Sequence, residues 1–339
     1  NDIFMVFFFG IATKEIVDSF LPGGALNPVK KAINPLLGTL GGVLGPVLVF
    51  FFLTSTLSVP HLNKGWGIPT ATDIALAWLA AKIIFGASHP AINFLLLLAI
   101  VDDAIGLGII AIFYGNPDHP VEPMYLALVA FAMLLAFLLR KLKTQQWTLY
   151  VFIPGTISWF GLYLAHLHPS LALVFIVPFL PAGKTDIGFF VAETEEAYDK
   201  HSHSPLEAFE HFFSFIVNFG LFFFAFANAG VVFSSVGTIT WIILASLIIG
   251  KTIGIVGFSL LGIGLGFSLP IGMKIQHLLV SAIIAGIGFT VALFVSGEAY
   301  NGATLIYQGP AKMGALFSIL GFVIAWVVAK MLRVKKAKF

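Results

Sequence analysis

Cysteine and charge are what this sequence lacks. None of its 339 residues is cysteine, so a disulfide framework and thiolate chemistry are both excluded. Charged residues make up 10% of the chain, whereas soluble domains hold about 25%. The formal net charge is only +2 and no basic block is present, so nothing favours nucleic-acid binding. The composition therefore predicts a polytopic membrane protein.

Apolar residues form eleven long runs along the chain. Hydrophobic residues make up 59% of the sequence, and a helix needs about 20 consecutive apolar residues to cross a bilayer. The run at 169–182 is short and holds Pro178 and Pro181, which disrupt a regular helix. The sequence predicts one all-α membrane domain over residues 1–339, with spans at about 3–20, 32–53, 66–85, 90–114, 122–139, 147–165, 169–182, 205–232, 239–267, 271–297 and 310–331.

Basic residues are distributed unevenly between the two sides of these spans. If successive loops alternate, only Lys64 and Lys312 lie on one side, Lys251 lies within a span, and all other lysines and arginines lie opposite. Loops rich in lysine and arginine stay in the cytoplasm, which predicts a cytoplasmic C-terminus and an external Asn1. The first span lacks the charged flank and cleavage site of a signal peptide. An external start that is not methionine predicts a further helix upstream.

Two adjacent carboxylates, Asp102 and Asp103, lie near the middle of the apolar run from Leu95 to Tyr114. An ionised carboxylate at the centre of a membrane helix costs about 2.5–3.5 kcal/mol on insertion scales. Two neighbouring carboxylates also repel each other. Folding does not require this cost, so the pair predicts a binding site for a cation.

Two other spans contain features that break a helix. Asp73 follows a segment, 65–72, that holds glycines, Pro69 and two threonines. The second candidate break is Gly286–Gly288, followed by Thr290. Broken helices occur at membrane depth only where they line protein or water, and their free carbonyls and helix ends suit ions. Both segments are therefore predicted to lie at a site.

The two breaks occupy equivalent places in the two halves of the chain. Residues 32–114 and 239–331 each contain three spans of which the middle one is interrupted. An odd number of spans lies between them, so the triplets have opposite orientations. This pattern predicts an inverted-repeat transporter in which two interrupted helices cross at the midplane. Lys251, about twelve residues into its span, lies near the same depth.

Several of these residues have two interpretations. Asp73 either caps a half-helix or takes part in ion binding, and the two roles are compatible. Lys251 is either a structural partner of Asp102 or a proton carrier. Gly250 and Gly254 form a GxxxG pattern that indicates close helix packing rather than a site.

Five segments, in this order, resemble the signature segments of the NhaA family of sodium/proton antiporters, whose members are themselves examples of the inverted-repeat architecture. The resemblance covers essentially the whole chain. It implies a twelve-helix antiporter of the bacterial inner membrane that expels Na+ or Li+ in exchange for more protons, serves sodium and pH homeostasis, needs no cofactor and is not an enzyme. The segments are GWGIPTATDIALAWL (65–79), LAIVDDAIGLGIIAIFY (98–114), FAFANAGV (224–231), IGKTIGI (249–255) and GIGFTVALFVSGEAY (286–300).

The resemblance also implies roles for individual residues. Asp103 is similar to the principal ion ligand of the family, and Asp102 to the partner of Lys251. Asp73 and Thr72 match the acid and the hydroxyl at the first helix break. Three further residues match positions linked to pH response, and these are His168, Glu210 and His211.

The chain departs from the family pattern in places. Ala12 stands where the family carries a carboxylate, which puts pH regulation in doubt. The family's first helix and the hairpin that mediates its dimerisation are not in this sequence, so a homodimer is expected only if other surfaces support it.

A mechanism follows from the carboxylate pair. Two neighbouring carboxylates in a desolvated site cannot both remain ionised cheaply, and they titrate as a coupled pair. Na+, a hard cation that prefers oxygen ligands, would then compete with protons for the site, with Thr72 and free carbonyls completing its shell. If two protons replace one Na+, the exchange is electrogenic.

Other classes of membrane protein fit less well. A retinal protein would place its lysine in the last of seven spans. A membrane aspartyl protease needs aspartates in YD and GxGD contexts, which are absent, and a prenyltransferase needs acidic metal motifs at the membrane surface, whereas the carboxylate pair here lies mid-span. The closest rival is a sodium-coupled organic-anion symporter, although no clear anion-binding arginine is present. The polar stretch 184–204 is interpreted as a solvated loop, with metal or proton sensing by His201 and His203 as the alternative.

Overall fold

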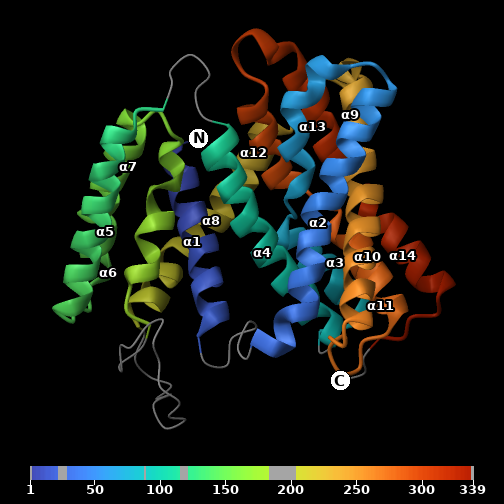
Figure 1. Ribbon diagram of the computed structural model, residues 1–339, viewed down its shortest axis with the longest axis horizontal. Coiled ribbons are helices and arrows are strands. Elements are labelled where there is room, and N and C mark those ends of the chain that lie inside the picture. The colour runs from blue at the N-terminus through green and yellow to red at the C-terminus, as the bar shows by residue number, and fades with distance from the viewer. Residues whose placement is uncertain (1, 22–28, 88, 115–120, 183–203, 337–339) are drawn as a thin grey trace. The chain divides into compact units, whose positions relative to one another are not determined.

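The computed structural model describes residues 2–21, 29–87, 89–114, 121–182 and 204–336, and these form helices without a strand (Figure 1). His201 and His203 lie outside the described residues. The chain divides into two compact units, Asn1–Asn27 with Leu107–Phe223, and Pro28–Gly106 with Phe224–Phe339. Each unit therefore combines segments that are far apart in the sequence.

The first unit packs its helices around a core of large apolar side chains. Phe209 and Phe213 meet Trp147, and Tyr150 is fully buried. Burial of such rings supplies most of the stabilisation of a helical core. Its elements are α1 (Asp2–Phe20), η2 (Pro123–Tyr125), α5 (Leu126–Lys141), α6 (Trp147–Phe152), α7 (Pro154–Leu164), the 3-10 helices η3 (Pro169–Phe175) and η4 (Val177–Phe179), and most of α8 (Pro205–Asn228).

The second unit contains both predicted repeats. In the first, α2 (Val29–Thr56) precedes the 3-10 helix η1 (Pro60–Thr70), α3 (Ile74–Phe85) and α4 (Pro90–Phe113), whose last residues belong to the first unit. The other elements are η7 (Phe233–Ser235), α9 (Thr238–Ala245), the π-helical turn η8 (Ser246–Gly250), α10 (Lys251–Gly264), α11 (Ile275–Ala285), α12 (Phe289–Ala299), η9 (Gly302–Tyr307), α13 (Gln308–Phe317) and α14 (Leu320–Met331).

Helix breaks occur where they were predicted. The axis bends by 58° between η1 and α3 and by 44° between α11 and α12. Both interruptions are therefore confirmed, and the middle element of each predicted repeat is the broken one.

The span count differs from the predicted eleven. Within the described ranges, six helices are long and apolar enough to cross a membrane, or up to eight if each bent pair is one span. Three expected spans are not among them. Span 3–20 contains Lys14, Glu15 and Asp18, span 147–165 is interrupted at Ile153 before Pro154, and span 169–182 is a short 3-10 segment.

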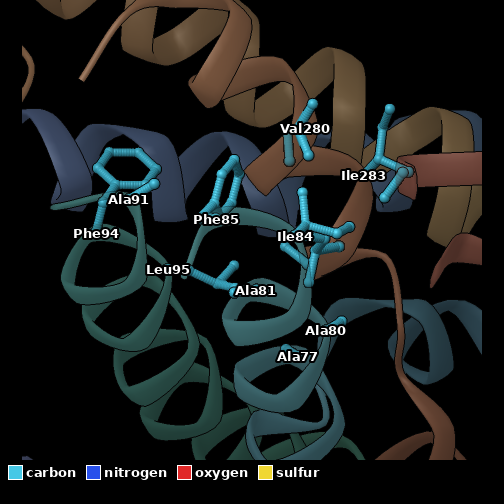
Figure 2. Close-up of a cluster of buried hydrophobic side chains, with 14 of the residues drawn as sticks. Ala77, Ala80, Ala81, Ile84, Phe85, Ala91, Phe94, Leu95, Val280 and Ile283 are labelled. Carbon is cyan, nitrogen blue, oxygen red and sulfur yellow. The ribbon is translucent and has the colours of Figure 1, made fainter. Parts of the chain in front are cut away.

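A hydrophobic cluster fixes α3 and α4 against α11 in the second unit (Figure 2). Phe85 and Phe94 are buried beside small residues of α3 such as Ala81. Val280 and Ile283 reach the cluster from α11. Because α3 begins at the first break and α11 ends at the second, this core determines how the two breaks meet.

Close backbone contact joins α2 to α10. A Cβ atom added at Gly254 would overlap the Gly41 carbonyl, and one at Gly250 would lie 2.7 Å from the Cα of Pro46. Only glycine permits this approach, so the GxxxG pattern serves helix packing, as predicted. The contact holds the start of α10, and with it Lys251, against α2.

Candidate functional site

The two helix breaks contact each other directly. The backbone N–H of Asp73 donates to the carbonyl of Ile287 over 2.7 Å, although each residue lies in the interruption of a different helix pair. A Cβ atom at Gly288 would lie 3.3 Å from the carbonyl oxygen of Ala71, so the backbones are in close contact. Backbone groups that the breaks release are therefore partly satisfied across the crossing.

Asp73 caps the start of two half-helices at once. Its Oδ1 accepts from the N–H of Leu76 in α3 at 3.0 Å. Its Oδ2 accepts from the N–H and the hydroxyl of Thr290 in α12, at 3.1 and 2.6 Å. A carboxylate at a helix N-terminus satisfies free N–H groups and offsets the helix dipole. The capping interpretation of Asp73 is thus present in the structure, at both breaks.

A second cluster forms around Asp102, which has no exposed surface. The ammonium of Lys251 donates to Asp102 Oδ2 at 2.7 Å and lies 2.6 Å from the hydroxyl of Thr72. That hydroxyl lies 2.9 Å from Asp102 Oδ2 and 2.9 Å from the carbonyl oxygen of Ala285. Because a threonine hydroxyl has one hydrogen, it donates to only one of these two acceptors at a time.

The other oxygen of Asp102 lies in a different environment. Oδ1 is buried and has no hydrogen-bond partner among the described residues. It faces α2 near Gly42, where an added Cβ atom would lie 3.5 Å away. A buried carboxylate oxygen that accepts no hydrogen bond is costly, which favours a proton or a cation on this carboxyl group.

Asp103 is also buried, with 8% of its surface exposed. It follows Asp102 on α4, so its side chain leaves the helix about 100° further round. The site therefore contains the buried pair of Asp102 and Lys251, with Asp73 next to Thr72 in the chain and the buried Asp103 next to Asp102.

The π-helical turn η8 directly precedes Lys251. It packs against the second break, since a Cβ atom at Gly286 would lie 2.6 Å from the carbonyl oxygen of Leu247. π-Helical turns are rare and often lie at functional sites. No sequence signal distinguishes Ser246–Gly250 from an ordinary apolar helix, so this turn was not predicted.

Ser318 is a second supporting residue that the sequence did not indicate. It lies between α13 and α14, where a single span was expected. Its hydroxyl accepts from the N–H groups of Gly288 and Phe289 at 3.2 and 3.3 Å and donates to Ala315 O at 2.6 Å. It therefore satisfies N–H groups at the start of α12.

The residues expected to respond to pH lie in the first unit. His168 Nδ1 lies 2.6 Å from the Ser170 hydroxyl, before η3. Glu210 forms an ion pair with Lys14, which also pairs with Asp18 at 2.5 Å. His211 is exposed on α8.

Comparison with known proteins identifies the family of this chain. A family model described as Na+/H+ antiporter 1 matches residues 1–331. The chain belongs to this family. Membership confirms the predicted class, an all-α membrane transporter of the NhaA type.

Individual relatives are similar over nearly the whole chain. The Na(+)/H(+) antiporter NhaA 2 of Pelobacter propionicus is 53% identical over 338 residues, which are 99% of this chain and 86% of the relative. The Na(+)/H(+) antiporter NhaA of Desulfitobacterium hafniense is 54% identical over 339 residues, covering 100% and 85%. That of Geotalea uraniireducens is 55% identical over 336 residues, covering 99% and 85%.

Proposed function

We propose that this protein exchanges Na+ or Li+ for more than one proton across the bacterial inner membrane, with its C-terminus in the cytoplasm. The exchange is electrogenic and serves sodium and pH homeostasis. One observation carries the proposal, namely that the fully buried pair of Asp102 and Lys251 contacts, through Thr72, the point where two broken helices meet, in a chain of an Na+/H+ antiporter family.

The chemistry of the site supports competition between Na+ and protons. Asp103 is the principal ion ligand, and Asp102 and Thr72 supply further oxygens beside it. Lys251 forms an ion pair with Oδ2 of Asp102. Its positive charge balances that carboxylate when the cation leaves. Hard cations prefer such carboxylate, hydroxyl and carbonyl oxygens. Since Lys251 forms its ion pair with Asp102, ionisation of the buried neighbour Asp103 adds a negative charge, which either a cation or a proton can neutralise.

The architecture supports alternating access. The two predicted repeats, 32–114 and 239–331, each place their broken element at the crossing. We propose that they are related by inversion, and that reorientation of this bundle exposes the carboxylates to each side in turn. Residues His168, Glu210 and His211 are proposed to modulate the response to pH from outside the site.

Reconstitution into proteoliposomes tests this function. A proton gradient monitored with a pH-sensitive dye should collapse when Na+ or Li+ is added, faster when the membrane potential is clamped. Asp103→Asn should abolish the collapse while the protein remains folded. Glu122→Gln, which changes an exposed acid, should leave it intact. Normal exchange by the Asp103 variant would refute the ligand assignment, and Na+-dependent uptake of an organic anion instead would favour a symporter.

A further inference from the structure

Two buried histidines contact each other in the second unit, away from the helix crossing. His89 directly precedes α4, and His277 lies in the first turn of α11. Their ring centroids are 4.5 Å apart with the planes at 81°. Their exposed fractions are only 9% and 6%. Because the charge of histidine changes near neutral pH, a buried contact between two imidazoles is sensitive to pH.

A phenylalanine completes the group. Phe85, the last residue of α3, stacks on His89 with centroids 5.2 Å apart and meets the edge of His277 at 6.1 Å. Figure 2 shows Phe85 and Ala91 in the buried cluster around the end of α3 and the start of α4. The three rings therefore join the end of α3 to the starts of α4 and α11.

Hydrogen bonds hold both histidines in the neutral form. Nδ1 of His89 accepts from the N–H of Ala91 at 3.1 Å, and Nδ1 of His277 accepts from the N–H of Lys274 at 3.0 Å. An imidazole nitrogen that accepts a hydrogen bond carries no proton, so the ring hydrogen lies on Nε2. A charged imidazole carries hydrogen on both nitrogens. Protonation of either ring therefore removes an N-terminal cap.

The surrounding charges do not compensate an imidazolium here. Lys274 adjoins the pair. Within the described residues, the charged groups at these ends of α3 and α14 are also basic, and they are Lys82 and Lys330, each placed over a tryptophan ring, and Arg333, Lys335 and Lys336. The acids on α3 and α4, Asp73, Asp102 and Asp103, belong to the ion site. Asp102 is 13 residues from His89, which is about 20 Å along a helix. Burial accordingly lowers the pKa of His89.

We propose that Phe85, His89 and His277 form an acid-released clasp that regulates the ion site. When both imidazoles are neutral, the clasp holds α3, α4 and α11 together. These helices carry Asp73, Asp102 and the second break, so releasing their ends alters the crossing. The clasp itself stands on the contacts above, whereas its effect on exchange rests on the proposed function.

Stability measurements test the clasp without reference to transport. A histidine whose pKa is lowered on folding binds more protons when unfolded, so folding stability falls as pH drops below the usual histidine pKa of about 6.5. The thermal midpoint of the purified protein should therefore be lower at about pH 5.5 than at about pH 7.5.

A double variant removes the titration but keeps both caps. Asn at position 89 can accept the same N–H two residues on, and Gln at position 277 is the usual third residue of a capping box. His89→Asn/His277→Gln should lose most of the acid-induced decrease in midpoint, while His61→Gln, at an exposed histidine, should keep it. An unchanged decrease in the double variant would overturn the clasp.

A second measurement needs no variant. In nitrogen-15 spectra of the nine histidines of the unmodified protein, two should show an unprotonated Nδ1 at neutral pH and titrate together below the usual range. Two histidines that titrate independently in the ordinary range would contradict the proposal.

Exchange assays then test the regulatory role. At saturating Na+ and about pH 5.5, below the usual histidine pKa, the double variant should retain a larger fraction of its neutral-pH rate than the unmodified protein. Equal fractions, with an altered stability profile, would overturn regulation. Absence of exchange in the unmodified protein, with the stability and titration results as expected, would overturn the proposed function and leave the clasp standing.

Discussion

The ammonium nitrogen of Lys251 lies 2.7 Å from Oδ2 of Asp102, and neither side chain is exposed to solvent. The two residues are 149 positions apart in the sequence. A pair of this kind contributes little net stability in itself, because both charges lose their hydration. Removing only one residue of the pair lowers the free energy of unfolding, because the other charge stays buried without a partner.

Lys251→Ala should therefore reduce the free energy of unfolding by about 3–5 kcal/mol. Adding Asp102→Asn to that variant should recover part of the loss, because the unpaired acid is removed. Thermal unfolding in detergent measures both, with Lys82→Ala as a control at an exposed lysine. A double variant no more stable than Lys251→Ala would argue against energetic coupling.

Asp73→Ala should remove the side-chain caps of both half-helices, at a cost of about 0.5–2 kcal/mol for each. Thr290→Val is the milder comparison, because it loses only the hydroxyl bond to Asp73, worth about 1 kcal/mol, and keeps the backbone bond. The thermal midpoint of Asp73→Ala should therefore be lower than that of Thr290→Val. Equal losses would mean that Asp73 does not support α3 and α12 independently.

Two glycines of α10 provide a matched pair for the contact with α2. Gly254→Ala should destabilise the protein by about 1–3 kcal/mol, because its methyl group would overlap the backbone of Gly41. Gly257 has nothing within 4 Å of an added Cβ, so Gly257→Ala should be neutral or gain up to about 1 kcal/mol of helix propensity. Similar thermal midpoints for the two variants would show that α2 and α10 do not approach closely.

Competition at the carboxylates predicts how the apparent affinity for Na+ changes with pH. Across the pH range in which the pair titrates, the apparent affinity for Na+ should weaken up to about tenfold per unit of falling pH for each proton displaced. The maximal rate should change much less above the range of the histidine clasp. Apparent affinities in proteoliposomes at several symmetric pH values give the answer. A constant affinity with a steeply varying rate would instead place control in a separate sensor, such as the region of His168 or Glu210.

The sequence predicted the two helix breaks and the buried acids and lysine well, because their signals are local. Pro69 and the glycines at 65, 67, 286 and 288 disrupt regular helices, and an acid pair within an apolar run has few explanations. The structure brings Thr72, Asp102 and Lys251 together and places Asp73 at both helix breaks. The roles of these residues in ion binding stay predictions.

Other features depend on contacts that no local pattern encodes. Ser246–Gly250 has the composition of an ordinary helix, and its π-turn is related to packing against Gly286. Ser318 supports the second break by accepting hydrogen bonds from Gly288 and Phe289, which are 30 and 29 residues away in the sequence. The 3-10 segments within 169–182 begin at or next to Pro169 and Pro178, and these prolines keep the segments too short to form a span.

The single hydrogen of the Thr72 hydroxyl makes Asp102 and the Ala285 carbonyl mutually exclusive acceptors. An ionised Asp102 attracts that hydrogen and leaves the last carbonyl of α11 without it, whereas a protonated Asp102 releases it to the carbonyl. The orientation of the Thr72 O–H group therefore depends on the charge of Asp102 on α4. It decides whether the carbonyl at the end of α11, in the other repeat, accepts a hydrogen bond. The hydrogen bonding at the second break thus differs between ionised and protonated Asp102 by the position of one hydrogen atom, without movement of the backbone.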